Sequence, residues 1–552
     1  MRGSSLRCFI ALSVLFSLGA AAQSQEQDHV SVVSDWTHHY AIYPDTPYPD
    51  LREQLQKDPR FQNEWYARHP EMWWLNTKRH HRPSNGSKRD WSVSLGATAE
   101  TAIRQTFPAK FVYNVTGTPS CANDYVVAGI PVAGSTTQAT LIAVNNLYSG
   151  TLNSTTGVCG TAPTVLFAYN VRTGYMIRSS VVPSLDGTKI AFVDYSATGS
   201  EFHVLTWKAG EGTSATAPAT PTASEMVSFA LGTYSTNTVF VDFYHDAAYV
   251  TAGTVMYKFS PVFNGTPAEV TTGGWPLTFG GASLISTPVY DQVTRHVFVE
   301  DTNGTVWYAD DSGSTSVVGT NSWAFATADG GHPPIVDTTN QKIYVYSSNG
   351  TTGSILGQAD ETLSTASRVT VNVGASGTGV VPESPDFNNA YYSGTLTGSA
   401  LYQVGQSSSS GHTALFDVGF STGWKMNANT ANGPIDIATN AVENSPITEF
   451  YNSTLSKDFL FIGTYDNCEA TGVTGGCVRA IDITAGFPTS VNPGTNSNAI
   501  LAAGGGTSGI VVDNNSSESE ASSIYYFTLG TAGSTCGPGN YCLVKATQSG
   551  LK

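Results

Sequence analysis

The residues whose types and spacing could do chemistry in this chain are, first, its paired acidic residues. Hydrolysis of a glycosidic bond needs two carboxyl groups roughly 5 to 10 Å apart, one of them acting as the acid. The candidates are Glu300 with Asp301, Asp310 with Asp311, and Glu383. Acidic residues beside β-turns more often form the turn itself. A carbohydrate-active enzyme, a glycoside hydrolase or lyase with a channel site of carboxylates, is therefore an alternative hypothesis. We lean toward a protein with no catalytic site.

The histidines are the next candidates, for metal binding or for a base. His38 and His39 are adjacent, as are His80 and His81, and His332 lies in a Gly-rich turn, DGGHPP. Adjacent histidines point their rings in different directions on most backbones, and none of these stands at the i, i+4 spacing of helical zinc sites. We expect no metal site, and His332 to be a turn residue that could face a central channel.

Cysteine spacing points to disulfides. Six cysteines follow the leader, an even number that is typical of an oxidising compartment. Two of the expected pairs flank Gly-rich loops between strand-like runs, and the third consists of the two cysteines that remain. A zinc site would need close C-x-x-C pairs, which the sequence lacks. The expected bridges are Cys468–Cys477, Cys536–Cys542 and Cys121–Cys159.

Charge and composition exclude one class of partner. Charged residues make up only 12% of the 552-residue chain and aromatic residues 11%, while Gly, Ser and Thr abound. The net charge is −16 with the two leader arginines and −18 without them. Nucleic-acid binders need extended basic surfaces, so we expect no nucleic-acid partner.

The chain should divide into four parts. Residues 1–22 have the basic start, apolar run and small-residue end of a signal peptide. Residues 23–77 form a Trp-rich, partly helical segment, with helical patterns over 50–57 and 59–75, the second of which Pro70 should break. Residues 78–89 read as a basic linker, and 90–552 as the main domain. No later stretch is apolar enough to span a bilayer as a helix.

The main domain is built from repeats. Each unit has an acidic or amide residue at the end of a short strand, then a turn, then a β-rich run. The marker residues stand 46 to 64 residues apart, at Asp124, Asp186, Asp242, Asp291, Asp337, Asn388, Glu449 and Asp513. A period near 50 with about four strands per unit predicts an all-β fold, a β-propeller. We expect eight blades, or seven if the irregular first unit is partly an insertion.

Tryptophans accompany the repeat. Trp275, Trp323 and Trp424 each precede the next unit, so we expect them at the edge of a blade or in the link to the next. Trp91 has the same surroundings but stands before the first full unit. A propeller removes free sheet edges when one terminus completes the blade that the other begins. The strand near Trp91 should therefore join the last blade near 541–547.

The repeats also resemble known ones. TPVYDQVTRHVFVEDTNGTVWYADDSG is similar to quinoprotein-like and YVTN-type propeller repeats, and SLDGTKIAFVD resembles the TolB-type repeat. The leader, the Trp-rich segment and the DWSVSLG start look like large secreted bacterial proteins that remain uncharacterised. The resemblance covers about 90–552 and implies the fold. Quinone-dependent dehydrogenases of this kind hold their cofactor against adjacent cysteines, which this chain lacks, so we expect no cofactor.

These observations predict a secreted β-propeller, extracellular or periplasmic, that acts as a binding or scaffolding module. The partner should be a glycan or an extracellular protein, because loops rich in Tyr and Trp suit both. We expect a monomer.

Overall fold

The described part of this computed structural model covers residues 30–37, 40–44, 57–69, 87–97, 106–114, 119–152, 155–326, 330–348, 353–375, 380–430, 432–468, 473, 475–493, 497–514, 520–528, 540–548 and 551. The predicted signal peptide, nearly all of the first helical pattern, the linker up to residue 86, both histidine pairs and Cys536 lie outside these residues.

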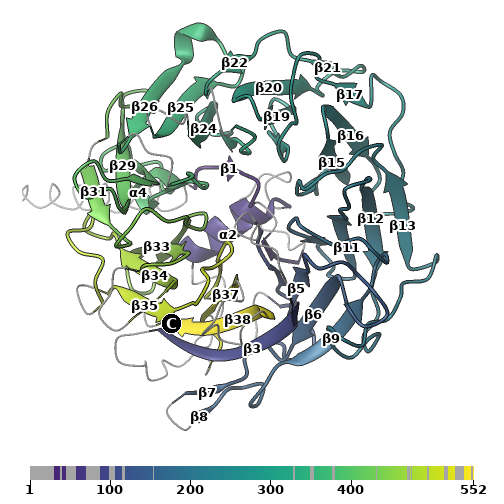
Figure 1. The fold of residues 1–552 in the computed structure, drawn as a ribbon. Helices are drawn as coiled ribbons and strands as arrows, with labels where there is room; N and C mark the ends of the chain where they lie inside the picture. The colour runs from purple at the N-terminus through teal and green to yellow at the C-terminus, as the bar shows by residue number, and fades with distance from the viewer. Residues whose placement is uncertain are drawn as a thin grey trace, which may run out of the picture.

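The described strands form eight antiparallel blades around a central axis, so the eight-bladed prediction is confirmed (Figure 1). From the innermost strand outward, the first four blades are β4 (Ala109–Phe111), β5 (Tyr125–Gly129), β6 (Leu141–Asn145) and β9 (Thr164–Tyr169); β10 (Val182–Pro183), β11 (Lys189–Val193), β12 (Glu201–Thr206) and β13 (Met226–Ala230); β14 (Phe240–Asp242), β15 (Ala247–Ala252), β16 (Val255–Phe259) and β17 (Leu277–Thr278); and β18 (Val289–Tyr290), β19 (His296–Glu300), β20 (Thr305–Asp310) and β21 (Val317–Val318), with β22 (Trp323–Ala324) also on β20.

The remaining blades are β23 (Ile335–Asp337), β24 (Lys342–Ser348), β25 (Ser354–Asp360) and β26 (Val369–Val373); β27 (Asp386–Phe387), β28 (Ala400–Gln406) and β29 (Thr413–Ser421), with β30 (Lys425–Met426) and β31 (Asn432–Asp436) both on β29; β32 (Thr448–Asn452), β33 (Lys457–Thr464), β34 (Cys477–Asp482) and β35 (Ala499–Ala502); and β36 (Val511–Asp513), β37 (Ser523–Thr528), β38 (Asn540–Gln548) and β3 (Ser87–Ala97). Outside the blades lie the hairpin of β7 (Thr151–Leu152) and β8 (Thr155–Thr156), α4 (Asn389–Tyr392) and a 3₁₀ turn at Thr365–Ser367.

The ring closes as the sequence predicts. Strand β3, from the N-terminal part of the chain, pairs along its length with β38, so that Trp91 lies opposite Lys545. The indole of Trp91 donates to the Leu147 carbonyl of the first blade at 3.0 Å. The strand begins at Ser87, so the last residues of the predicted linker belong to the propeller.

The acidic repeat markers form turns at the ends of the innermost strands. Asp291, directly after β18, accepts hydrogen bonds from the backbone of Val293 at 3.3 Å and Thr294 at 2.8 Å. Asp242 and Asp337 hold the corresponding turns of their own blades. Each such turn sends the chain from the innermost strand into the second strand. These repeat markers therefore have a structural role, since aspartate side chains commonly stabilise turns.

The connections place the two kinds of loop on opposite faces of the ring. The links from the outermost strand of one blade to the innermost strand of the next lie on one face, which we call the link face. The aspartate turns lie on the other, the turn face. The second strand of each blade returns to the link face, so β19 ends there at Glu300 while β20 runs back to Asp310.

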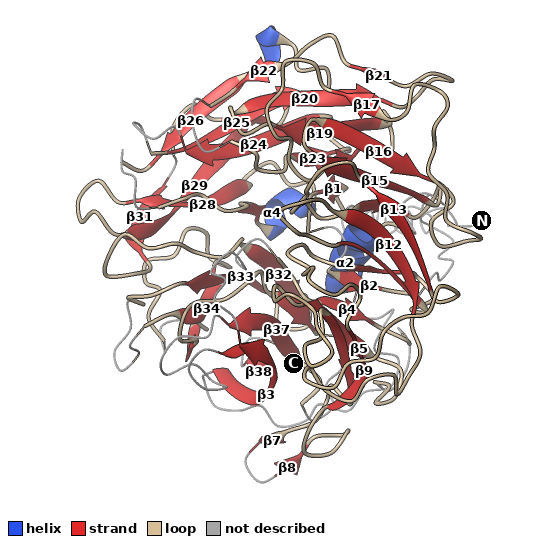
Figure 2. Ribbon diagram, turned by 45° about the vertical axis from the view of Figure 1, so that its right-hand side comes forward, coloured by secondary structure: helices blue, strands red, loops and turns tan. Residues whose placement is uncertain are grey.

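The described parts of the N-terminal segment lie in the central channel. Strand β1 (Val33–Ser34) pairs with β23, and β2 (Ala41–Ile42) runs parallel to β4. Each therefore adds a short strand on the inner side of a blade. Helix α2 (Pro59–Arg68) lies at the centre of the ring (Figure 1), and Figure 2 shows α2 and α4 on the inner side of the strands. The helix ends just before Pro70, as predicted.

Helix α2 is polar and yet buried, because the blades supply partners for its side chains. Its N-cap, Asp58, accepts from the Phe61 backbone at 2.9 Å and from Gln292 on the turn face at 2.6 Å. Near the other end, Arg68 donates to Glu449 of the seventh blade at 3.2 Å and to Asn389 at 2.9 Å. The helix thus spans the channel from the fourth blade to the seventh on the turn-face side.

Two predicted disulfides are present. Cys121 and Cys159 join two loops of the first blade, with Cα atoms 5.4 Å apart. Cys468 and Cys477 close the β33–β34 hairpin at a Cα separation of 5.8 Å. Cys542 is also disulfide-bonded, and its expected partner, Cys536, lies outside the described residues. Across the described chain, no helix is long and apolar enough to cross a membrane.

Candidate functional site

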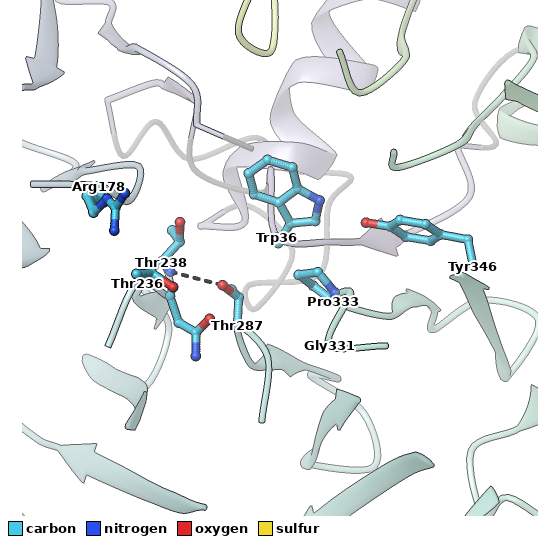
Figure 3. Close-up of a pocket in the computed structure, with 9 residues that line it drawn as sticks. Trp36, Arg178, Thr236, Thr238, Thr287, Gly331, Pro333 and Tyr346 are labelled. Atoms are coloured by element: carbon cyan, nitrogen blue, oxygen red, sulfur yellow. Dashed lines mark hydrogen bonds between the residues drawn. The ribbon is translucent and has the colours of Figure 1, made fainter. Parts of the chain in front are cut away.

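A pocket of about 150 Å³ opens at the link face, on the channel axis. Four consecutive links between the first and fifth blades contribute to it, together with β24 and Trp36, the second residue after β1. Figure 3 shows the indole ring of Trp36 between Thr238 on one side and Tyr346 on the other. The lining residues are Trp36, Arg178, Thr236, Asn237, Thr238, Thr287, Gly331, Pro333 and Tyr346.

Trp36 is placed by the strand that precedes it. Because β1 runs antiparallel to β23, the chain reaches the link face directly after Ser34, and Trp36 packs edge-on against Phe107 with ring centroids 5.1 Å apart. Its side chain is only 4% exposed. The indole nitrogen, on the side of the ring facing Tyr346 in Figure 3, has no hydrogen-bond partner among the described residues. A buried N–H without a partner is costly, so a small shift of the ring that let this group donate to a bound molecule would be favourable.

The rim of the pocket is held by a chain of hydrogen bonds from blade to blade. The backbone N–H of Phe107 donates to the Ser180 hydroxyl at 2.9 Å, and that of Ser180 donates to Thr238 at 3.1 Å. The N–H of Thr238 donates in turn to Thr287 at 2.9 Å, the dashed line in Figure 3. Each hydroxyl belongs to the link of the following blade. The rim is therefore pre-formed, as small-molecule sites usually are.

The Tyr346 side of the pocket is backed by buried acids. The ring of His332 lies against Tyr346, with centroids 5.1 Å apart. Burial, followed by the nearby carboxyl of Glu383, raises the pKa of Tyr346 well above its ordinary value. Burial also raises the pKa of Glu300 well above the usual range of a carboxyl group. For Tyr346 and Glu300 the shift favours the neutral form.

The acidic pairs named from the sequence do not come together. Glu300 and Asp301 lie at the link-face end of the fourth blade, whereas Asp310 and Asp311 lie at its turn-face end. Asp301 forms a turn with Asn303 at 2.9 Å. Asp311 accepts from Lys258 at 2.6 Å. The two pairs are therefore separated by the length of strand β20, which runs from one face of the ring to the other.

Of the remaining sequence candidates, Glu383 and His332 are buried near Tyr346 at the link face. His332 thus lies beside the pocket wall, in the turn where the sequence placed it. The tryptophans of the repeat lie at the outer strands: Trp275 just before β17, Trp323 in β22 and Trp424 between β29 and β30. They are part of the scaffold rather than of the pocket.

One group of side chains has the composition of a metal site. Asp194, Glu201 and His203 bring their ligand atoms within 4.8 Å of one another in the second blade. The Arg172 guanidinium lies 3.3 Å from Asp194 and 3.1 Å from Glu201, so a cationic side chain already occupies this position. The arrangement is that of an ion-pair cluster.

The sequence analysis missed the pocket residues, Trp36 above all. A readable signal was the hydroxyl residue one or two places before several innermost strands, at Ser180, Thr238 and Thr287. The convergence of four links around the axis, however, depends on how the ring closes.

No protein-family model matches the sequence, and no curated protein is detectably similar to it. The fold is similar to solved structures at low identity. BamB from Moraxella catarrhalis is 11% identical, with a TM-score of 0.42 over 84% of this chain and 97% of that one. The C-terminal WD40 domain of Sif2 is 11% identical, with a TM-score of 0.36 over 74% of this chain and 99% of that one. A protein from Lactobacillus plantarum is 11% identical, with a TM-score of 0.35 over 68% and 98%.

Proposed function

We propose that this protein is a binding propeller that holds a glycan or an extracellular protein at its link face, with one group of the ligand in the pocket beneath Arg178, Thr236 and Pro333. The observation that carries this proposal is the pocket itself, a pre-formed polar hollow at the meeting point of four blade links. The described parts of the N-terminal segment, β1, β2 and α2, lie in the channel behind it, so a ligand would approach from the link face.

Export and a monomeric state are part of the proposal. The basic, apolar and small-residue pattern of residues 1–22 is that of a signal peptide. The disulfides Cys121–Cys159 and Cys468–Cys477 are typical of oxidising compartments, which supports an extracellular or periplasmic location. Strand β3 completes the last blade, so the ring has no unfinished blade that a second copy would have to complete, which supports a monomer.

The test is binding of the purified protein, from Gln23 onward, to arrays of polysaccharides and extracellular proteins, with released reducing sugar measured on the same samples. Thr236 is exposed at the pocket rim, so Thr236→Trp should fill the pocket without disturbing the core. The matched control is Thr136→Trp, at an exposed threonine of the β5–β6 turn outside the pocket.

We expect Thr236→Trp to weaken binding more than tenfold and Thr136→Trp to leave it unchanged, with no sugar released. Equal effects of the two substitutions would place the ligand elsewhere and overturn the proposal. Release of reducing sugar would instead establish an enzyme, and the buried acids beside Tyr346 would then be the first residues to replace.

A further inference from the structure

The pocket continues into a row of tyrosines on the link face of the second blade. Arg178, which lines the pocket, stacks on Tyr195 with its guanidinium carbon 4.7 Å from the ring centroid. Tyr195 makes an edge-to-face contact with Tyr234 at 6.1 Å. Tyr175 lies on the other side, since Met176 forms a β-bridge with Tyr195. We call Tyr175, Tyr195 and Tyr234 the tyrosine row.

Tyr234 is the open end of this row. Its side chain is 40% exposed, although the link that carries it also lines the pocket two residues later, at Thr236. The tyrosine row comes from three separate segments, namely the β9–β10 link, the β11–β12 turn and the β13–β14 link. These segments bring the aromatic rings together beside the pocket, and they are held by backbone hydrogen bonds such as Tyr195 N–H to the Met176 carbonyl at 2.7 Å.

The surface around the tyrosine row is electrically balanced. The carboxylates of Asp194 and Glu201 lie within 3.3 Å of Arg172, and Arg172 itself covers the ring of Tyr175 at 3.5 Å. Hydroxyl groups of Ser196 and Thr198 hydrogen-bond to the Tyr175 hydroxyl and lower its pKa. Such a surface offers aromatic rings and neutral hydrogen-bonding groups, with little net charge to attract a polyanion or a polycation.

The pocket suits part of one unit of a sugar chain in size and polarity. Its volume of about 150 Å³ is that of an engineered cavity that holds benzene, so a pyranose ring, which is larger, would enter in part and project from the mouth. Five of its nine lining residues carry neutral hydroxyl or amide groups, at positions 236, 237, 238, 287 and 346. The unpartnered indole N–H of Trp36 adds a buried donor. The Thr238 and Thr287 hydroxyls already accept backbone N–H bonds, and the Asn237 amide already donates twice. A polyhydroxylated ring would use their remaining lone pairs and hydroxyl protons, for which an apolar side chain of a protein partner has no partner group.

We infer that the ligand is an uncharged polysaccharide or oligosaccharide whose terminal pyranose ring enters the pocket and whose next units lie across Tyr195 and Tyr234. This inference rests on the proposed binding function and specifies its ligand class and a second subsite. The half-open ring of Tyr234 stacks on one of these units. Arg172 and Arg178 already cover one face of Tyr175 and of Tyr195, so these two rings contribute mainly their edges and hydroxyl groups.

The test is calorimetric titration of the mature protein with neutral oligosaccharides of one to six units, from the cello-, manno- and xylo-series, beside acidic oligogalacturonides. Affinity for a neutral series should rise from one unit to about three and then level off. Tyr234→Ala should weaken binding of the trisaccharide about three- to tenfold, the usual size of one aromatic contact, and leave the monosaccharide unaffected. The matched control is Tyr113→Ala, a tyrosine 55% exposed at the turn-face end of the first blade.

The possible outcomes distinguish the inference of a tyrosine subsite for a neutral glycan from the proposal that the pocket binds a ligand. Affinity that does not depend on chain length or on Tyr234, yet is lost in Thr236→Trp, would overturn the tyrosine subsite and leave the pocket in place. Binding of the acidic series or of a protein alone would overturn the neutral glycan. If Thr236→Trp did not weaken binding, the proposal that the pocket holds the ligand would itself be wrong.

Discussion

The Nη2 atom of Arg60 lies 3.1 Å from each carboxylate oxygen of Asp386, although the two residues are 326 positions apart. Arg60 belongs to the helix in the channel and Asp386 to the innermost strand of the sixth blade. Both side chains are almost fully buried, and the same guanidinium donates to the hydroxyls of Tyr40 and Tyr392 at 2.6 Å. This contact ties the N-terminal segment to the wall of the channel.

Replacement of Arg60 should therefore be strongly destabilising. In Arg60→Ala, Asp386 would keep a buried charge without its main partner, which typically costs about 3–5 kcal/mol. Urea unfolding followed by tryptophan fluorescence measures the loss. Arg89→Ala, at an exposed arginine of β3, is the matched control and should change stability by less than about 0.5 kcal/mol. Equal losses in the two variants would contradict the assigned role of Arg60.

Stability should fall as the pH rises from about 4 to about 7. Burial raises the pKa of Asp58 to about 7 and that of Asp458 to about 6. Between the ordinary pKa of 3.8 and these values the folded state binds more protons than the unfolded state, so a rise in pH favours unfolding. Thermal melts across this range should show a decreasing Tm. Asp458→Asn should flatten the decrease below pH 6, and a wild-type Tm that rises from pH 4 to 7 would contradict the prediction.

Closure of the ring by β3 should be visible in exchange experiments. Trp91 is buried, packs on Tyr525 at 6.0 Å and bonds to the first blade, so Trp91→Ala should cost about 3–5 kcal/mol. Hydrogen exchange followed by mass spectrometry should show the earliest loss of protection in β37 and β38. Uniform loss around the ring, or none, would argue that the ring is held closed by other contacts. Tyr113→Ala serves as the exposed aromatic control.

Peptide mapping without reductant should yield the Cys121–Cys159 and Cys468–Cys477 linkages, and also the predicted Cys536–Cys542 linkage. Loss of either described bridge, by paired Cys→Ser substitution, should lower stability by about 2–4 kcal/mol. Free thiols at any of these positions in the native protein would refute the corresponding bridge.

The sequence alone predicted the blades well because a blade is a local structure. Its turns depend on residues such as Asp291 and on alternation within a few strands, and its hairpin disulfide joins cysteines nine residues apart. The repeat also predicted that the strand containing Trp91 closes the ring, because a last blade without this strand would expose an unpaired strand to other chains.

The place of the N-terminal segment and the pocket were decided by the tertiary structure. The helix at Pro59–Arg68 has the polar composition of an exposed helix, and it is buried only because Asp386, Glu449 and Gln292 supply its partners from distant blades. Trp36 reaches the pocket because β1 pairs with β23, three hundred residues further along the chain. Such contacts are fixed by the number of blades and the width of the channel, and local patterns in the sequence encode neither.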